Sequence, residues 1–251
     1  MAHQIILYDM ATKVGPYSLN TWRTRYALNF KDLPFTTVWL ELCDVERELR
    51  AVGAPPSGTW PDGRPQYTVP TIFDSLTNRY ISDAHQIARY LDETYPDKPT
   101  LFPHGTVGLQ HAFVEEFFRK VVFPVFSIVA EGCYGVMSER TAMYFRETRE
   151  KMFGKTLEEL WGDTAAIAKG WVEMKEGLDW VERLVQENGD DKLYLLGDSP
   201  VEADLAIASA FQWIIKANAA CWDEVKTLNG GRWARLVDGL HHYEGDVDAS
   251  A

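Results

Sequence analysis

The sequence predicts two domains, an α/β domain at residues 1–95 and an all-helical domain at residues 109–251. Up to Tyr95, short apolar segments alternate with segments in which apolar residues recur at helical spacing. Beyond Gly108, nearly every segment has helical spacing. Residues 96–108 contain three prolines and two glycines, which is typical of a linker. These observations favour an α/β domain followed by an all-α domain.

Local patterns predict the elements of the first domain. A short continuous apolar run indicates a buried strand, and the spacing of Leu19, Trp22 and Tyr26 indicates one face of a helix. The acidic stretch 44–50 is compatible with a helix and runs into a loop rich in proline and glycine at 53–65. The predicted strands are Ile5–Tyr8, Phe35–Leu40, Val69–Phe73 and Arg79–Ser82, and a last helix containing Ile87, Tyr90 and Leu91 ends at Tyr95–Pro96.

The second domain is expected to be built around two strongly apolar helices. Phe113, Phe117 and Val121 share one face of the first of them, which predicts that it is buried between neighbours. The segment Leu205–Ile215 is nearly all apolar and is predicted to form the core. It follows Ser-Pro-Val-Glu, which has the form of a capping box with Ser199 as the N-cap.

The composition is that of an ordinary globular protein, with 46% hydrophobic and 25% charged residues; only the acidic tail 246–251 suggests disorder. A net charge of −12 argues against nucleic acid as a partner. The apolar run Ile5–Tyr8 is too short for a signal peptide, and no stretch is long enough to span a membrane, so we expect a soluble cytoplasmic protein. Cys43, Cys133 and Cys221 have no metal-binding or redox spacing, which predicts no metal and fits a reducing compartment.

Four segments carry recognisable motifs. They are Tyr67–Phe73 with its Val-Pro pair, Ile81–Leu91 with Ser-Asp before Ile-Ala-Arg-Tyr-Leu, Gly15–Leu28 with Ser-Leu-Asn-Thr-Trp-Arg-Thr, and Leu195–Leu205 with Gly-Asp-Ser-Pro-Val-Glu-Ala-Asp. Together with the order of elements they resemble the cytosolic glutathione transferase family. The resemblance implies a thioredoxin-like first domain that binds glutathione as co-substrate. Within the family, the third segment is similar to the serine-type bacterial β-etherase branch and the related fungal-specific transferases.

The Val-Pro pair implies a contact with the glutathione backbone. In the family this valine pairs through its N–H and C=O with the cysteine residue of glutathione, as an added strand would, and the peptide bond to the proline is cis. The resemblance assigns these positions to Val69 and Pro70. Without the resemblance, the same residues are also compatible with a strand that simply starts at a proline.

The start of the last helix of the first domain implies a second contact. In the family an acidic residue and a serine open this helix, whose N-terminus binds the γ-glutamyl carboxylate while the acidic side chain holds the α-amino group. Asp83 matches the acidic position, but Ala84 stands where the serine is usual, so one hydroxyl contact is lost. Asp83 or Ser82 acting only as a helix cap is the structural alternative.

Ser18 is the candidate catalytic residue. In serine-type members a serine at the start of the first helix donates a hydrogen bond to the glutathione sulfur, and Ser18 occupies that position. A free thiol has a pKa of about 8.5, so a hydroxyl donor and a helix N-terminus would both favour the reactive thiolate. Tyr17 and Asn20 remain alternative donors or substrate contacts, and Ser18 as a plain N-cap remains the structural alternative.

Two further assignments concern the glycine carboxylate of glutathione and the fourth motif. The group that meets the glycine carboxylate of glutathione should lie within residues 41–67, where Arg64 and Gln66 are the candidates. The fourth motif is structural, because in the family its last aspartate, here Asp204, stabilises the turn beneath the buried helix. Val201 replaces the usual Ser or Thr three residues earlier, which led us to place the cap at Ser199.

The resemblance implies a transferase whose glutathione thiolate attacks hydrophobic aromatic electrophiles, esters or peroxides. Aromatic co-substrates are expected between Tyr17 and residues such as Phe117, although an aromatic residue on a helix is more often part of a core. A carrier of aromatic metabolites is the main alternative, which the Ala84 departure favours, and cleavage of β-aryl ethers is a third. Family membership also implies a homodimer.

Overall fold

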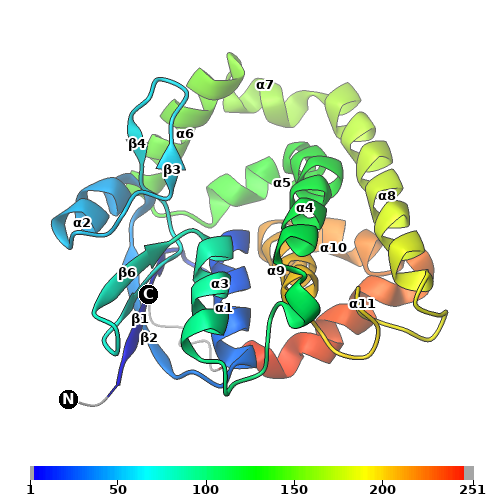
Figure 1. The fold of residues 1–251 in the computed structure, drawn as a ribbon. Coiled ribbons are helices and arrows are strands. Elements are labelled where there is room, and N and C mark those ends of the chain that lie inside the picture. Colours follow the sequence, from blue (N-terminus) through cyan, green and yellow to red (C-terminus); the bar gives the residue numbers. More distant parts are fainter. Residues whose placement is uncertain (1–2, 246–251) are drawn as a thin grey trace.

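The computed structural model describes residues 3–245, and the predicted acidic tail lies outside this range. Two layers of different character lie side by side (Figure 1). One is a four-stranded sheet with its helices, and the other is a bundle of helices. Within residues 3–245, no helix combines the length and the apolar character that crossing a membrane requires.

The sheet of the first domain has the strand order β2-β1-β5-β6. Strand β1 pairs in parallel with β2 and antiparallel with β5, and β5 pairs antiparallel with β6. The strands are β1 (Ile5–Met10), β2 (Phe35–Leu40), β5 (Thr71–Asp74) and β6 (Arg79–Ser82). The predictions for β2 and β6 are confirmed residue for residue, whereas the third predicted strand begins at Thr71 and leaves Val69 and Pro70 in the preceding loop.

Alternation along β1 places a helical layer on each face of the sheet. Ile5 and Leu7 are fully buried in the same core as α1 (Leu19–Phe30) and α3 (Ala84–Thr94). On the opposite face, Tyr8 belongs to a smaller cluster with Leu40 and with residues of α2 (Val45–Ala51), which follows a short 3₁₀ turn. The stretch 44–50, which the sequence shows as compatible with a helix, therefore contains most of this second helix.

A hairpin inside the predicted proline- and glycine-rich loop was missed. It pairs β3 (Gly58–Thr59) with β4 (Pro65–Gln66) and stands away from the main sheet (Figure 1). Each strand is only two residues long, which is too short to show an alternation of apolar and polar residues. The sequence therefore carried no periodic signal for it.

The second domain surrounds the buried helix α9 (Glu202–Ala217). The first helix of this domain begins at Val107, inside the predicted linker, and continues through a π-helical turn directly into α5. The other helical elements are η2 (Pro103–Gly105), α4 (Val107–Phe117), η3 (Phe118–Val122), α5 (Phe123–Gly135), α6 (Glu139–Phe153), α7 (Leu157–Gly162), α8 (Thr164–Gln186), α10 (Ala219–Val225), α11 (Leu228–Leu240) and η4 (His241–Tyr243).

The start of α9 corrects the predicted capping box. The N-cap is Val201, two positions beyond the predicted cap at Ser199, so that prediction is wrong. The carboxylate of Asp204 instead accepts hydrogen bonds from the backbone N–H of Val201 (2.9 Å) and of Leu195 (2.8 Å). A valine can stand at the cap because Asp204 reaches back to satisfy its N–H, as the family resemblance implies for this aspartate.

The two domains meet across α1 and α9 through buried polar contacts as well as apolar packing. The Arg23 guanidinium of α1 forms an ion pair with the Glu202 carboxylate at the start of α9, and both side chains are almost completely buried. On the same interface, the Trp213 indole N–H donates to the Tyr17 hydroxyl at 2.9 Å. The relative position of the domains is therefore fixed by specific partners.

A stacked histidine pair also crosses the domain boundary. The ring of His85 on α3 lies 4.1 Å from that of His111 on α4, measured between centroids. The pKa of His85 is lowered to about 4, mainly by burial; the neighbouring His111, Arg23 and Arg89 act in the same direction, and Asp83 opposes them. The folded protein therefore holds His85 neutral at pH values where an exposed histidine, with a pKa near 6.5, is partly charged.

His85 is expected to make the stability fall in acid. Because its pKa is lower in the folded chain than in the unfolded one, its contribution is complete above about pH 6.5 and is lost as the pH falls toward 4. Urea unfolding at pH 7 and pH 5 should show a loss roughly 1–2 kcal/mol larger for the wild type than for His85→Gln. His242→Gln, at an exposed histidine, is the control and should behave as the wild type. Equal losses in His85→Gln and the wild type would contradict this account.

Candidate functional site

Three segments that carry the predicted site residues meet at one edge of the sheet. Thr71 pairs with Tyr8 on one side and with Ser82 on the other, so Val69 and Pro70 lie near the end of β1 and near the start of α3. The backbone N–H of Asp83 donates to the Pro70 carbonyl at 3.2 Å. The chain leaves β1 at this edge and returns as α1, which Ser18 precedes. The topology therefore brings together the β1–α1 loop, the Val-Pro pair and the start of α3.

Ser18 sits at the N-cap position of α1, but its side chain does not cap the helix. Its backbone carbonyl accepts from the Trp22 N–H at 2.9 Å, as an N-cap residue should, with φ −61° and ψ 129°. Its half-buried hydroxyl makes no hydrogen bond to any residue in the range 3–245. The hydroxyl and the first N–H groups of α1 are therefore available to an anion at the same place.

The Val69–Pro70 peptide bond is cis, as the resemblance implies. Pro70 is buried, whereas Val69 is half-buried. Within the described part of the chain, neither the N–H nor the C=O of Val69 has a hydrogen-bond partner. Because unpaired main-chain groups beside a sheet can pair with an extended peptide, Val69 retains the capacity predicted for it.

Asp83 acts as the helix cap that the sequence offered as the structural alternative, and its contact with the α-amino group of glutathione stays a prediction. One of its carboxylate oxygens accepts from the backbone N–H of His85 at 3.0 Å and of Gln86 at 3.1 Å, so it does cap α3. Its backbone is in an unusual conformation for a residue other than glycine, with φ +80°. Ala84 is almost completely buried as the first residue of α3. Half-buried Asp83 therefore presents a carboxylate at the sheet edge, and Ala84 presents no hydroxyl.

Tyr17 is placed differently from the prediction. Its side chain is only 3% exposed, and its hydroxyl accepts from Trp213 in the domain interface beside Cys133. Burial raises the pKa of Tyr17 well above its usual value and that of Cys133 to about 11, so both groups stay protonated. A phenol that is almost completely buried between the domains packs them together, and its role as an alternative donor to sulfur stays a prediction.

The other predicted substrate contacts differ from each other. Asn20 is half-buried in the first turn of α1, and its side chain has no hydrogen-bond partner within residues 3–245, so it stays a candidate. Phe117 has no exposed surface and packs against Phe113 and Phe118 in the core of the second domain. The prediction that Phe117 lines a substrate site is therefore wrong. Phe117 is part of the core, which was the alternative given for an aromatic residue on a helix.

The candidates for the glycine carboxylate both lie on the β3–β4 hairpin. The Arg64 side chain is 73% exposed and pairs with Asp62 at 2.8 Å. The Gln66 carbonyl accepts from the backbone N–H of Ser57 at 2.8 Å, which holds the base of the hairpin. In this conformation the guanidinium of Arg64 is engaged at the exposed end of the hairpin, and only Gln66 lies near the base.

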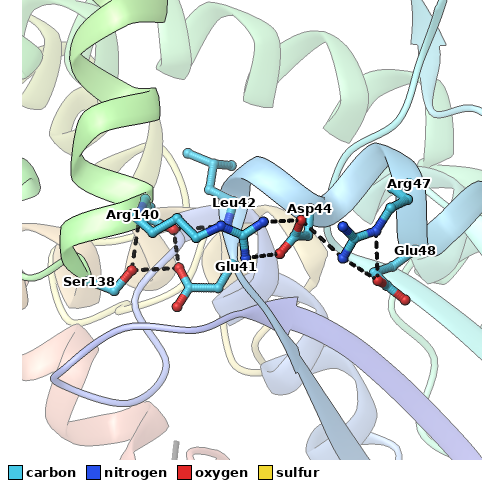
Figure 2. A network of polar contacts seen from close by, with 8 residues as sticks. Glu41, Leu42, Asp44, Arg47, Glu48, Ser138 and Arg140 are labelled. Atoms are coloured by element: carbon cyan, nitrogen blue, oxygen red, sulfur yellow. Dashed lines mark hydrogen bonds and ion pairs between the residues drawn. The ribbon is translucent and has the colours of Figure 1, made fainter.

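Sequence reasoning missed the part that α6 plays beside the site. Helices α6 and α7 run across the upper part of the molecule from the first domain to α8 (Figure 1). The first turn of α6 is joined to the segment after β2, where Glu41 accepts from the hydroxyls of Ser138 (2.6 Å) and Thr141, and Asp44 pairs with Arg140 (Figure 2). The pairing with Arg140 holds the pKa of Asp44 below its usual range. Only Ser138 gave a sequence signal, as a residue type that favours helix N-caps.

Within residues 3–245 there is no cluster of three or more His, Cys, Asp or Glu side chains that could hold a metal ion. The three cysteines are free thiols, and Cys133 and Cys221 are buried. The chemistry that the sheet edge offers is therefore that of a hydroxyl, helix N-termini, unpaired backbone groups and a carboxylate.

Comparison with known proteins agrees with this arrangement. Residues 17–94 match the model of the glutathione S-transferase N-terminal domain, and residues 108–243 match that of the glutathione S-transferase C-terminal domain. The chain is 27% identical over 230 residues to a glutathione S-transferase-like protein of Aspergillus flavus, with 88% of this chain and 82% of that protein covered.

Solved structures extend the agreement to the whole fold. The glutathione transferase GSTFuA3 of Phanerochaete chrysosporium is 38% identical, with a TM-score of 0.90 over 96% of this chain and 97% of that one. A glutathione S-transferase of Ceriporiopsis subvermispora, solved in complex with glutathione, is 35% identical, with the same TM-score and coverage. The chain therefore belongs to the glutathione transferase family, with the family's N-terminal and C-terminal domains both present and fungal enzymes among its structural relatives.

Proposed function

We propose that this protein activates the thiol of glutathione for attack on hydrophobic aromatic electrophiles, esters or peroxides, with Ser18 as the catalytic residue. One observation carries the proposal: the Ser18 hydroxyl stands at the N-terminus of α1 and is not used by the helix or by any other residue in the described range. Because no residue in that range accepts from the Ser18 hydroxyl, its proton is free to be donated to the sulfur.

The energy required is within reach of this arrangement. Lowering the pKa of a thiol from about 8.5 by two units needs about 2.7 kcal/mol in favour of the thiolate. A hydrogen bond to a charged group contributes about 1.5–3 kcal/mol, and a helix N-terminus adds about 0.3–1 kcal/mol. The hydrogen bond from Ser18 and the first turn of α1 together can therefore lower the thiol pKa by this amount.

The rest of the tripeptide would be held along the same edge. The N–H and C=O of Val69 would pair with the cysteine residue of glutathione, with Pro70 fixing the loop behind it. Asp83 and the N-terminus of α3 would hold the γ-glutamyl end, with Ala84 contributing only its backbone N–H. Gln66 or Arg64 would meet the glycine carboxylate. The complex of the Ceriporiopsis relative with glutathione supports the choice of ligand.

A carrier of small aromatic molecules is the second candidate. The observation that favours it is Ala84, because the missing hydroxyl would weaken the binding of glutathione, on which a carrier of aromatic molecules does not depend. We also propose a homodimer, by analogy with the family, and a reducing location such as the cytoplasm, because all three cysteines are free.

A panel of acceptors distinguishes the candidates. The wild-type protein should accelerate the reaction of glutathione with at least one of an activated aryl halide, an aryl ester, a hydroperoxide and a model β-aryl ether. Calorimetry should show that glutathione binds in the absence of any acceptor. Tight binding of aromatic molecules without acceleration of any reaction would favour the carrier, and no binding of glutathione would overturn both the transferase and the site described above.

A further inference from the structure

One arginine of α6 lies on the face of that helix that turns toward the interior. Ala142 and Phe145 are buried, and Arg149 follows them at the spacing i, i+3 and i+7, which keeps it on the same face. At the end of this face, Phe153 stacks on Phe126 of α5, with ring centroids 5.6 Å apart. The Arg149 side chain therefore projects between aromatic residues.

Among residues 3–245, no carboxylate pairs with the Arg149 guanidinium. It lies 4.9 Å from the centre of the Phe145 ring and donates one weak hydrogen bond, of 3.3 Å, to the Thr148 hydroxyl. The other arginines that are buried or half-buried in the described part of the chain each pair with a carboxylate; these are Arg23, Arg25, Arg146 and Arg232. Arg149 is the exception among them.

The electrostatic surroundings place Arg149 beside the domain interface. Burial lowers the pKa of Arg149, and its positive charge acts on the thiol of Cys133 in α5. Cys133 in turn neighbours the Tyr17 hydroxyl, one residue before Ser18. Arg149 and Tyr17 therefore share Cys133 as a neighbour.

An unpaired cation in a partly dry place is costly unless something compensates it. Arg149 is only half-buried and none of its nitrogens is a buried atom without a partner, so water still reaches it; a bound anion would replace that water with a charge-assisted hydrogen bond. The neighbouring Arg146 offers no free charge, since Glu150 and Glu158 both pair with it. Of these two arginines on α6, Arg149 is therefore the one that can pair with an anionic ligand.

We propose that Arg149 binds the anionic group of an aromatic ligand, a carboxylate, sulfonate or phenolate, whose rings lie against the aromatic side chains of α5 and α6. The inference rests on the proposed function, because it concerns the class of molecule accepted beside Ser18. Glutathione also carries carboxylates, but its proposed contacts lie on the first domain at Val69 and Asp83, whereas Arg149 lies on the second.

Two fluorescent ligands with the same rings test the inference. Anilinonaphthalene sulfonate carries a negative charge, and phenylnaphthylamine is its neutral counterpart. Arg149→Met should weaken binding of the sulfonate about tenfold, which is the loss of about 1.4 kcal/mol, and should change binding of the neutral ligand less than twofold. Arg149→Lys should retain most of the affinity for the sulfonate.

Arg183→Met is the matched control, because Arg183 on α8 is exposed and its loss changes the net charge equally. It should leave both ligands unaffected. Equal weakening of the charged and neutral ligands by Arg149→Met would reduce Arg149 to a packing role and overturn the inference. Weaker binding of glutathione with unchanged binding of both ligands would also overturn it, since the partner would then be a glutathione carboxylate. Neither ligand needs the thiol, so a failure of the transferase proposal would show separately, as a wild type that binds the sulfonate through Arg149 but not glutathione.

Discussion

Replacing Ser18 with alanine is expected to lower kcat/KM for glutathione-dependent turnover by roughly 10–1000-fold, or about 1.4–4 kcal/mol of transition-state stabilisation. The hydroxyl has no structural partner within residues 3–245, so its removal should leave the fold intact. Loss of the donor should also raise the pKa of bound glutathione toward the value of the free thiol. The measurements are steady-state kinetics and a pH titration of the bound thiolate by its ultraviolet absorbance.

Two rival donors provide the controls for this prediction. Tyr17→Phe removes a hydroxyl that already accepts from Trp213, and its effect on turnover should be small. Asn20→Ala removes the other free polar group in the first turn of α1. If Asn20→Ala abolished turnover while Ser18→Ala left kcat/KM and the thiol pKa unchanged, the catalytic role would pass from Ser18 to Asn20.

Replacing Glu202 with alanine is expected to destabilise the protein by about 3–5 kcal/mol. Glu202 is fully buried at the start of α9, and the change leaves the Arg23 guanidinium of α1, itself 6% exposed, without a counter-charge. One nitrogen of Arg23 already lacks a hydrogen-bond partner in the described structure, so no alternative acceptor stands ready. Urea unfolding followed by circular dichroism measures the loss.

A double substitution separates the charge from the packing. Arg23→Met combined with Glu202→Gln removes both charges and keeps similar volumes, and it should recover at least half of the stability lost in Glu202→Ala. If Glu202→Ala cost less than about 1 kcal/mol, the pair would resemble an exposed ion pair and would not fix the two domains relative to each other.

The sequence predicted best where a local pattern and the tertiary environment agree. Phe35–Leu40 and Arg79–Ser82 are strands at their predicted boundaries because β-forming residues there are bounded by turns. The predicted cap at Ser199 was wrong because it was inferred from residue spacing alone. In the structure the carboxylate of Asp204 accepts from the backbone N–H of Val201, and Val201 is the N-cap. Which residue is the N-cap depends on the angle at which the chain enters α9, which no local pattern records.

The residues of the candidate site also differ in whether local sequence or tertiary packing determines their place. The family resemblance assigned Ser18, Val69 and Asp83 by their motifs, and the topology brings these three positions to one sheet edge, while their roles stay predictions. Phe117 and Arg149 could not be assigned from the sequence. Helical spacing tells which side of a helix is buried, but only the packing of α4, α5 and α6 decides whether that side meets a core or a ligand.

A crystal structure of the protein soaked with glutathione tests the central claim most directly. We expect the sulfur within about 3.5 Å of the Ser18 Oγ atom and the cysteine residue of the tripeptide paired with the backbone of Val69. A tripeptide whose sulfur lay outside hydrogen-bond reach of Ser18, or whose backbone did not meet Val69, would contradict the account.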